Sequence, residues 1–117
     1  MIEITPIRNL NAAVAVPGSK YIANRVLLIA ALAEGISTIK NVPDNEDINQ
    51  VISVLQELGV KIEKKDPSTL LIEGMKGIFP PAAANPAATE LQVKESGTLL
   101  RFLTALSSLI PGKTTIT

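Results

Sequence analysis

The chain has 117 residues with no cysteine and no histidine, and its 11 lysines and arginines balance its 11 acidic residues. A zinc cluster, a thiol nucleophile and a histidine base are therefore excluded, and the balanced charge without interleaved aromatics argues against a nucleic-acid surface. With 46% hydrophobic and 3% aromatic residues, the core must be aliphatic, and the length suits one domain of ordinary size.

No segment of the chain predicts export or membrane insertion. Residues 1–10, MIEITPIRNL, lack the charged and apolar regions of a signal peptide, and the apolar stretch at residues 26–33 is too short to span a bilayer. The absence of cysteine agrees with a reducing compartment. We therefore expect a soluble cytoplasmic protein with neither a membrane partner nor a nucleic-acid partner.

Strands and helices alternate along the first part of the chain. Hydrophobic periodicity and turn residues predict, in order, strands at 2–7 and 12–16, a helix at 20–33, a strand at 36–40, a helix at 46–58 and a hairpin of strands at 60–64 and 69–73. Gly35 and Gly59 end the two helices. The first helix is apolar all round, whereas the second has one apolar stripe. The stripe consists of Ile48, Val51, Ile52, Leu55 and Leu58.

A stretch rich in proline and alanine divides the chain. Residues 79–88, FPPAAANPAA, predict an extended linker. After it, a strand at 89–93, a helix at 96–109, a turn at 111–113 and a strand at 114–117 begin the same order again, with little residue identity. The predicted α/β organisation has N-terminal strands at 1–16, a first βαβαββ unit at 17–78, the linker at 79–88 and the truncated start of a second unit at 89–117. Alternatively, 114–117 is the last edge strand of a small α/β domain.

The most informative motif is PGSKYIANR at residues 17–25, where a turn leads into the first helix. Ser19 is a suitable N-cap, and a helix N-terminus attracts anions through its unpaired N–H groups and its dipole. Lys20 and Arg25 add positive charge, so the motif predicts a site for a phosphate or a carboxylate. The alternative is a capped helix whose two cations only reach into solvent.

A second stretch, ESGTLLR at residues 95–101, repeats this arrangement. It places a turn at Gly97, a hydroxyl at Ser96 or Thr98, and Arg101 one turn into a helix. If the two helices lie side by side, their N-termini converge on one ligand with two anionic groups. Alternatively, Ser96 is only a cap and Arg101 forms an ion pair at the surface or between helices.

Four segments follow one another along the chain: PGSKYIANRVLLIAALAEG, NVPDNEDINQVISVLQELGVKIE, SGTLLRFLTAL and PGKTTIT. In this order and at these separations they resemble the N-terminal part of the 5-enolpyruvylshikimate-3-phosphate synthase family, covering about its first quarter. The resemblance implies transfer of the enolpyruvyl group of phosphoenolpyruvate to the 5-hydroxyl of shikimate 3-phosphate. Phosphate is released without a metal or an organic cofactor, in aromatic amino-acid biosynthesis.

The resemblance also implies roles for individual residues. Lys20 matches a lysine at the meeting point of the two substrates, and Arg25 matches an arginine that contacts the shikimate phosphate. Gly97 and Thr98 match the turn against which phosphoenolpyruvate lies. Arg101 matches an arginine of that segment, either as a ligand contact or as a structural residue of the helix.

Two positions depart from the family pattern. Tyr21 stands where the family has a serine, and Glu95 stands where it has asparagine or another small or neutral residue. A carboxylate beside a phosphoenolpyruvate site repels the ligand, or it ties up a cation such as Lys20, Lys94 or Arg101. By the resemblance, Tyr21 is a substrate-binding position with an altered side chain. Glu95 and Arg101 are further candidates for substrate binding.

In the family, βαβαββ units form an inside-out barrel with inward-facing helices, and the N-terminal strands pair with the other domain. We therefore expect one complete unit and part of a second here. Residues 1–117 match none of the family's acid, base and later arginine groups, so no catalytic residue is assigned to them. The implied partners are phosphoenolpyruvate, shikimate 3-phosphate and the missing C-terminal part, without which we expect no turnover.

Two other functions stay open on the sequence. The related transferase that acts on UDP-N-acetylglucosamine shares the implied fold, although its first helix usually has a neutral sequence where this chain has Arg25. A non-catalytic anion-binding or assembly module fits Tyr21, Glu95 and the abrupt end of the chain, because a fold does not guarantee its function. The coding sequence beyond Thr117 distinguishes these alternatives.

Overall fold

The computed structural model describes residues 1–6, 8–80, 88–94 and 96–117. Its helices are α1 (Lys20–Leu32), α2 (Glu46–Glu57) and α3 (Gly97–Leu106), the last followed by a 3-10 turn, Ser107–Leu109. Its strands are β1 (Glu34–Ile39), β2 (Lys61–Asp66), β3 (Thr69–Met75), β4 (Ala88–Leu91) and β5 (Lys113–Ile116). Every helix and strand predicted after residue 19 is confirmed, with its ends shifted by a few residues.

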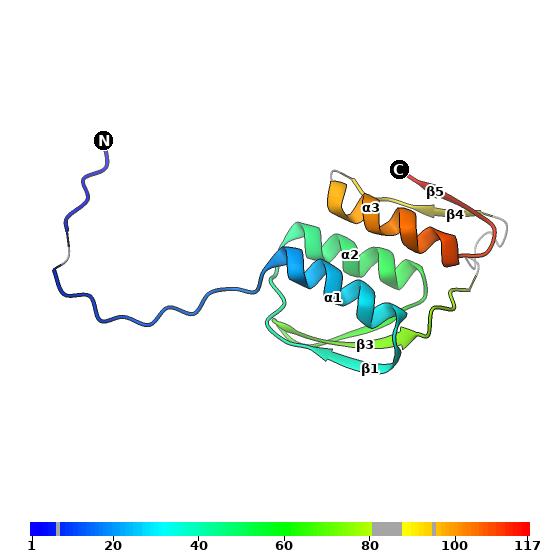
Figure 1. Ribbon diagram of the computed structural model, residues 1–117, viewed down its shortest axis with the longest axis horizontal. Helices are drawn as coiled ribbons and strands as arrows, with labels where there is room; N and C mark the ends of the chain where they lie inside the picture. Colours follow the sequence, from blue (N-terminus) through cyan, green and yellow to red (C-terminus); the bar gives the residue numbers. More distant parts are fainter. Residues whose placement is uncertain (7, 81–87, 95) are drawn as a thin grey trace.

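The described strands form two sheets. β1, β3 and β2 make an antiparallel sheet in that order, with β3 in the centre. β4 and β5 pair in parallel, and α3 connects them as a crossover. The helices lie between the two sheets, which form the outer layers (Figure 1). The mixed α/β class predicted from the sequence is therefore confirmed.

α1 is held closely against the antiparallel sheet. Its buried apolar side chains are Ala23, Leu27, Leu28, Ala30 and Ala31. The close fit requires a glycine in β3, because a Cβ on Gly74 would overlap the backbone carbonyl oxygen of Ala33. Complete burial of a leucine such as Leu27 contributes about 1.5–3 kcal/mol to folding. On another side of α1, Ile22 and Ile29 are exposed despite the apolar sequence of the helix.

α2 is amphipathic, as its sequence predicts. Asn45 caps it by accepting a hydrogen bond from the backbone N–H of Ile48 at 3.0 Å, and acidic residues occupy its first turn. Its buried stripe consists of Ile48, Val51, Val54 and Leu55. The sequence predicted Ile52 in this stripe, but the structure buries Val54 instead. Ile52 lies half-buried at the edge of the core. Neither α2 nor any other described helix is long and apolar enough to cross a membrane.

One hydrophobic core joins the two parts of the chain. The buried side chains of the second part belong to the same cluster as those of α1 and α2; they include Leu91, Val93, Leu99 and Leu103. The linker predicted at residues 79–88 lies mostly outside the described residues. At its ends, however, Phe79 is only 2% exposed and Ala88 begins β4. The folded body therefore includes both ends of the predicted linker.

The N-terminal arm, of which the structure describes residues 1–6 and 8–16, extends away from the body (Figure 1). The strands predicted at 2–7 and 12–16 are not formed by the described residues of this arm. The apolar alternation suits a strand, but a strand is stable only where a neighbouring strand pairs with its N–H and C=O groups. Side chains such as Ile4 and Val14 are exposed, and the structure as described places no strand beside them.

Candidate functional site

α1, α2 and α3 all start at the same end of the body, the end from which the arm leaves (Figure 1). A helix start has backbone N–H groups without an intrahelical partner, and it carries the positive end of the helix dipole. Lys20, Asp47 and Gly97 lie in these first turns. The candidate site is the region where these helix starts meet.

Lys20 forms an ion pair across two helix starts. Its Nζ donates a hydrogen bond to Oδ2 of Asp47 in α2 at 2.7 Å. This hydrogen bond and the attraction of the carboxylate raise the pKa of Lys20, so the ammonium stays protonated. The two side chains are 45% and 38% exposed, so water screens the pair. Lys20 is thus held in place by a partner that another anion can replace.

Asp47 is the residue that sequence reasoning missed. The turn before α2 was identified, but no role was assigned to the acidic residues that follow it. The available signal was the pair Glu46 and Asp47 directly after the N-cap residue Asn45. Carboxylates in a first turn are stabilised by the helix dipole and attract any cation at the same end of the body.

A hollow of about 540 Å³ lies between the start of α2 and the turn before α3. It is lined by Glu46, Asp47, Gln50, Val93, Lys94 and Ser96. Gln50 braces it by donating a hydrogen bond from Nε2 to the carbonyl oxygen of Gln92 at 2.7 Å. Across it, Nζ of Lys94 lies 4.0 Å from Oε1 of Glu46. The hollow therefore contains carboxylates of α2 facing a lysine, and Asp47 links it to Lys20.

The turn before α3 leads directly into Gly97 and Thr98. Ser96 caps this helix, because its Oγ accepts a hydrogen bond from the backbone N–H of Leu99 at 3.3 Å. A Cβ added to Gly97 would meet nothing within 4 Å, so the backbone there is open. The structure thus brings the predicted residues Lys20, Gly97 and Thr98 to one end of the body.

Arg25 lies against α3 and does not line the hollow. Its Nη1 donates a hydrogen bond to the carbonyl oxygen of Tyr21 at 2.7 Å. Its guanidinium carbon lies 5.3 Å from the ring centroid of Phe102, within the range of cation–π attraction. The side chain also lines an apolar groove between α1 and α3. A contact between Arg25 and a phosphate in the hollow would require a different rotamer.

Tyr21, which departs from the family pattern, is 61% exposed. Its ring centroid lies 5.6 Å from Nζ of Lys20, which places an aromatic ring beside the ammonium. The ring leaves the hydrogen bond between Lys20 and Asp47 in place. Arg101 is exposed on α3, and Glu95 lies outside the described residues.

Comparison with known proteins gives one consistent result. A family model described as EPSP synthase (3-phosphoshikimate 1-carboxyvinyltransferase) matches residues 4–117. The chain is 41% identical over 104 residues to 3-phosphoshikimate 1-carboxyvinyltransferase of Paraburkholderia phymatum, covering 89% of this chain and 23% of that protein. It is 37% identical over 105 residues to the chloroplastic 3-phosphoshikimate 1-carboxyvinyltransferase of Brassica napus, covering 89% and 20%. The chain spans about a fifth to a quarter of the length of these curated relatives.

The fold is also found in a solved structure. EPSP synthase from Acinetobacter baumannii matches this chain with a TM-score of 0.74 and 24% sequence identity. The match covers 88% of this chain and 23% of the other. At this level of identity, the similarity supports the fold but does not assign functions to individual residues.

Proposed function

The chain belongs to the EPSP synthase family, and we propose that it forms part of the substrate cleft of a 3-phosphoshikimate 1-carboxyvinyltransferase. As the resemblance implies, such an enzyme transfers an enolpyruvyl group from phosphoenolpyruvate to shikimate 3-phosphate. The observation that carries the proposal is the ion pair between Lys20 and Asp47 where the helix starts meet. A protonated lysine beside unpaired backbone N–H groups suits a phosphorylated carboxylate.

Lys20 binds substrate in this proposal by exchanging its partner. A phosphate or carboxylate of the ligand accepts the same charge-assisted hydrogen bond that Asp47 accepts in the free chain. Because the pair is exposed to water, separating it costs little. Asp47 is then able to accept a hydrogen bond from a substrate hydroxyl. The positive charge of the Lys20 ammonium is thus balanced by Asp47 before binding and by the ligand anion after it.

Gly97 and Thr98 supply the second contact. The first turn of α3 offers backbone N–H groups, Gly97 has no side chain to cover them, and Thr98 adds a hydroxyl. Arg25 contributes to phosphate binding after it leaves Phe102, and Tyr21 borders the same ligand. Substrate binding thus combines a cation from α1 with an open backbone from α3.

The finer architecture belongs to the same proposal. Residues 17–78 correspond to a first βαβαββ unit and 89–117 to the start of a second, in a barrel whose helices face inward. The position of the helices between two sheets supports this arrangement. In a full-length enzyme residues 1–16 pair with the other domain, and the acid, base and later arginine groups come from outside these 117 residues. The chain alone therefore has no turnover.

A pair of lysine variants tests the binding site. Lys20→Met removes the proposed ligand, whereas Lys61→Met removes another exposed lysine, which pairs with Glu73 on the sheet. We expect Lys20→Met to weaken the binding of shikimate 3-phosphate or phosphoenolpyruvate about tenfold or more in isothermal calorimetry, because a hydrogen bond to a charged group is lost. Lys61→Met should leave binding unchanged. Equal weakening by both variants would contradict the assignment.

A coupled phosphate-release assay tests the expected inactivity. With both substrates present, the chain alone should release no phosphate above the blank, and turnover would contradict this part of the proposal. UDP-N-acetylglucosamine serves as the comparison ligand in calorimetry. The relatives described above are named for the shikimate substrate, so the UDP-sugar alternative has no support among them.

A further inference from the structure

Lys94, in the turn before α3, has a backbone conformation that favours glycine. Its φ is 47°, in the left-handed region where a side chain strains the backbone. Elsewhere the chain adopts positive φ at glycines: Gly35, Gly59, Gly77 and Gly112. The turn at Lys94 is closed by the backbone N–H of Ser96, which donates a hydrogen bond to the carbonyl oxygen of Val93 at 3.1 Å. A glycine would make the same turn without strain, so the fold alone does not explain a lysine at this position.

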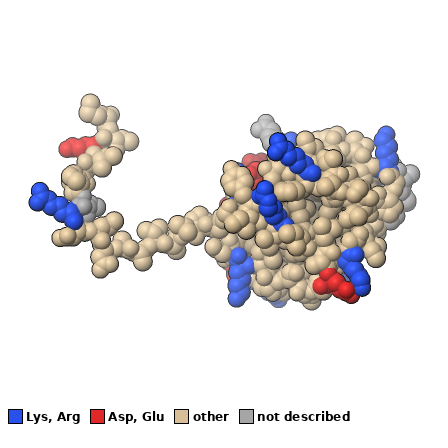
Figure 2. Space-filling model, viewed as in Figure 1, with Lys and Arg blue, Asp and Glu red and all other residues tan. Residues whose placement is uncertain are grey.

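The side chain of Lys94 lines the hollow of the candidate site. Among the described residues that line this hollow, Lys94 alone is a cation, whereas Glu46 and Asp47 are carboxylates. A ligand anion that enters the hollow meets both carboxylates, so it requires positive charge close by. On the face shown in Figure 2, Lys and Arg side chains are scattered over the body rather than gathered in one patch. Anion binding at the hollow therefore depends on individual lysines at its border.

Glu46 is a weak partner for Lys94. Nζ of Lys94 and Oε1 of Glu46 are 4.0 Å apart, and the two side chains are 64% and 87% exposed. Water and salt screen an exposed pair of this length, so it contributes little to stability. Such a pair gives no structural reason for the strained backbone. The ammonium of Lys94 therefore has a neighbouring carboxylate that a ligand anion displaces easily.

Lys20 and Lys94 form two similar pairs at this site, the first with Asp47 and the second with Glu46. The N···O distance is 2.7 Å in the Lys20 pair and 4.0 Å in the Lys94 pair. Both carboxylates belong to the first turn of α2, and both pairs are exposed to water. Each ammonium is thus beside an anion that a ligand anion can replace. Two replaceable anions match a ligand that carries two anionic groups, such as a phosphate and a carboxylate.

We propose that Lys94 is a second binding cation for phosphoenolpyruvate, which holds one anionic group of this ligand while Lys20 holds the other. The inference rests on the proposed function, because the ligand is taken from it. Glu46 leaves Lys94 when the ligand binds, in the same way as Asp47 leaves Lys20. The strained turn places this ammonium directly before the open backbone at Gly97. Lys94 therefore compensates for the negative charge that α2 brings to the hollow.

Calorimetric titration of the chain with phosphoenolpyruvate tests this role. Lys94→Met removes the ammonium and keeps the strained backbone, whereas Lys94→Gly removes both. We expect each variant to weaken binding about tenfold or more, because a hydrogen bond between charged groups is lost. Lys94→Arg keeps a cation at this position and should bind similarly to the unaltered chain. Weakening by Lys94→Gly without weakening by Lys94→Met would assign the effect to the backbone and overturn the proposal.

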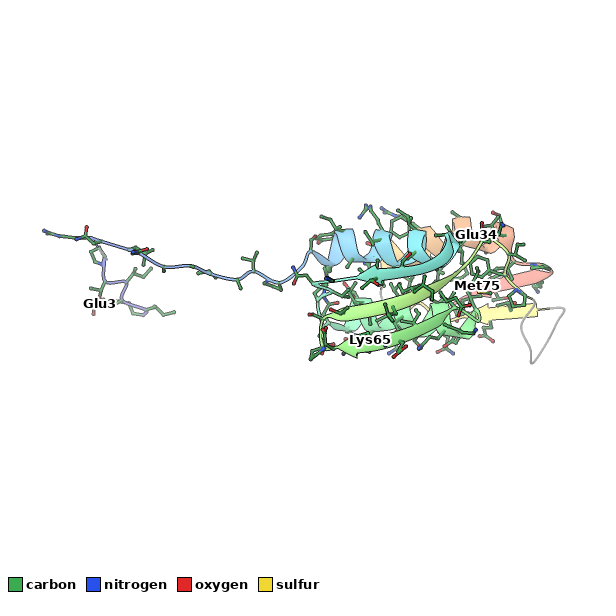
Figure 3. The ribbon with its side chains drawn as sticks, turned by 90° about the horizontal axis from the view of Figure 1, so that it is seen from below. Glu3, Glu34, Lys65 and Met75 are labelled. Carbon is green, nitrogen blue, oxygen red and sulfur yellow. The ribbon has the colours of Figure 1, made fainter. Side chains whose placement is uncertain are left out.

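Lys76 provides the matched control. It is another lysine with positive φ, at 54°, and its Nζ lies 2.9 Å from Oε1 of Glu34. Glu34 lies at the end of the sheet away from the arm, so this pair is distant from the helix starts (Figure 3). Lys76→Met and Lys76→Gly should leave the binding of phosphoenolpyruvate unchanged. Lys76 and Lys94 are both exposed, so the variants keep the fold of the body, and circular dichroism checks this.

The outcomes separate this inference from the proposed function. Binding that Lys20→Met weakens, and that neither Lys94→Met nor Lys94→Gly weakens, overturns the role of Lys94 and leaves the proposed function standing. Equal weakening by the Lys94 and Lys76 variants indicates a general effect of charge, and it overturns the role of Lys94 as well. An unaltered chain that binds no phosphoenolpyruvate overturns both the inference and the proposed function.

Discussion

The segments that precede helices α1 and α3 have similar sequence patterns but different structures. Each has a serine at its N-cap and follows a stretch with apolar residues at alternate positions. Before α3 this stretch is a paired strand, β4, whereas before α1 it is an extended arm. The difference lies in the neighbour, because β5 lies beside β4 and the described structure places nothing beside the arm. A strand-like pattern therefore specifies a strand only where a second strand lies next to it.

The two helix starts also contribute different groups to the candidate site. α1 brings a cation, Lys20, which Asp47 holds in place. α3 brings an open backbone at Gly97 and a hydroxyl cap at Ser96. One start offers charge and the other offers N–H groups. Variants at comparable positions of the two starts test this division.

The glycine next to each helix start gives the largest expected difference. A Cβ at Gly18 would overlap the backbone carbonyl oxygen of Asn41, whereas a Cβ at Gly97 would meet nothing within 4 Å. We expect Gly18→Ala to lower the free energy of unfolding by about 1–3 kcal/mol, because backbone atoms must move aside. Gly97→Ala should change it little. Urea denaturation measures both values, and equal effects would remove the contrast between the two starts.

The two N-cap serines should differ by a smaller amount. The Oγ of Ser96 accepts a hydrogen bond from the backbone N–H of Leu99, whereas the side chain of Ser19 makes no capping hydrogen bond. Ser96→Ala should therefore destabilise the chain by about 1 kcal/mol, within the range measured for lost N-caps. Ser19→Ala should be close to neutral. Thermal unfolding of both variants checks this, and a larger loss for Ser19→Ala would show that the cap forms in solution.

The ion pair at α1 should produce the smallest effect, visible at alkaline pH. Because Asp47 raises the pKa of Lys20, its stabilisation is complete below the ordinary lysine pKa and is lost as the pH rises through the raised value. Asp47→Asn should return the pKa of Lys20 toward its ordinary value and reduce this alkaline loss of stability. An NMR titration of the Lys20 side chain measures the change. Glu73→Gln, which breaks the exposed pair with Lys61, is the control and should leave the Lys20 titration unchanged.

The helices were predictable because their determinants are local. The Asn45 cap, the apolar stripe of α2 and the left-handed glycine at Gly59 all lie within or beside the helix that they define. A helix satisfies its backbone hydrogen bonds within one segment, so periodicity and caps identify it without knowledge of the fold. The position of α1 in the fold was less predictable. Its apolar sequence suggested burial on all sides, but Ile22 and Ile29 remain exposed.

The candidate site was predictable only in part. Lys20, Gly97 and Thr98 were expected at helix starts, and the structure brings those starts to one end of the body. The partner of Lys20 was not expected, because Asp47 lies far along the chain in a different helix. The direction of Arg25 was also not expected, since its contact with Phe102 depends on how α1 lies against α3.

The sequence by itself determined the order of helices and strands, the anion-favouring helix starts at Lys20 and Gly97, and the resemblance to a family. Only the tertiary structure decided the sheet order β1-β3-β2, the burial of Phe79 and the unpaired state of the described residues 1–6 and 8–16. The physical reason is the range of the interactions. Helix hydrogen bonds and caps join residues a few positions apart, whereas strand pairing and ion pairs join residues that only the folded chain brings together.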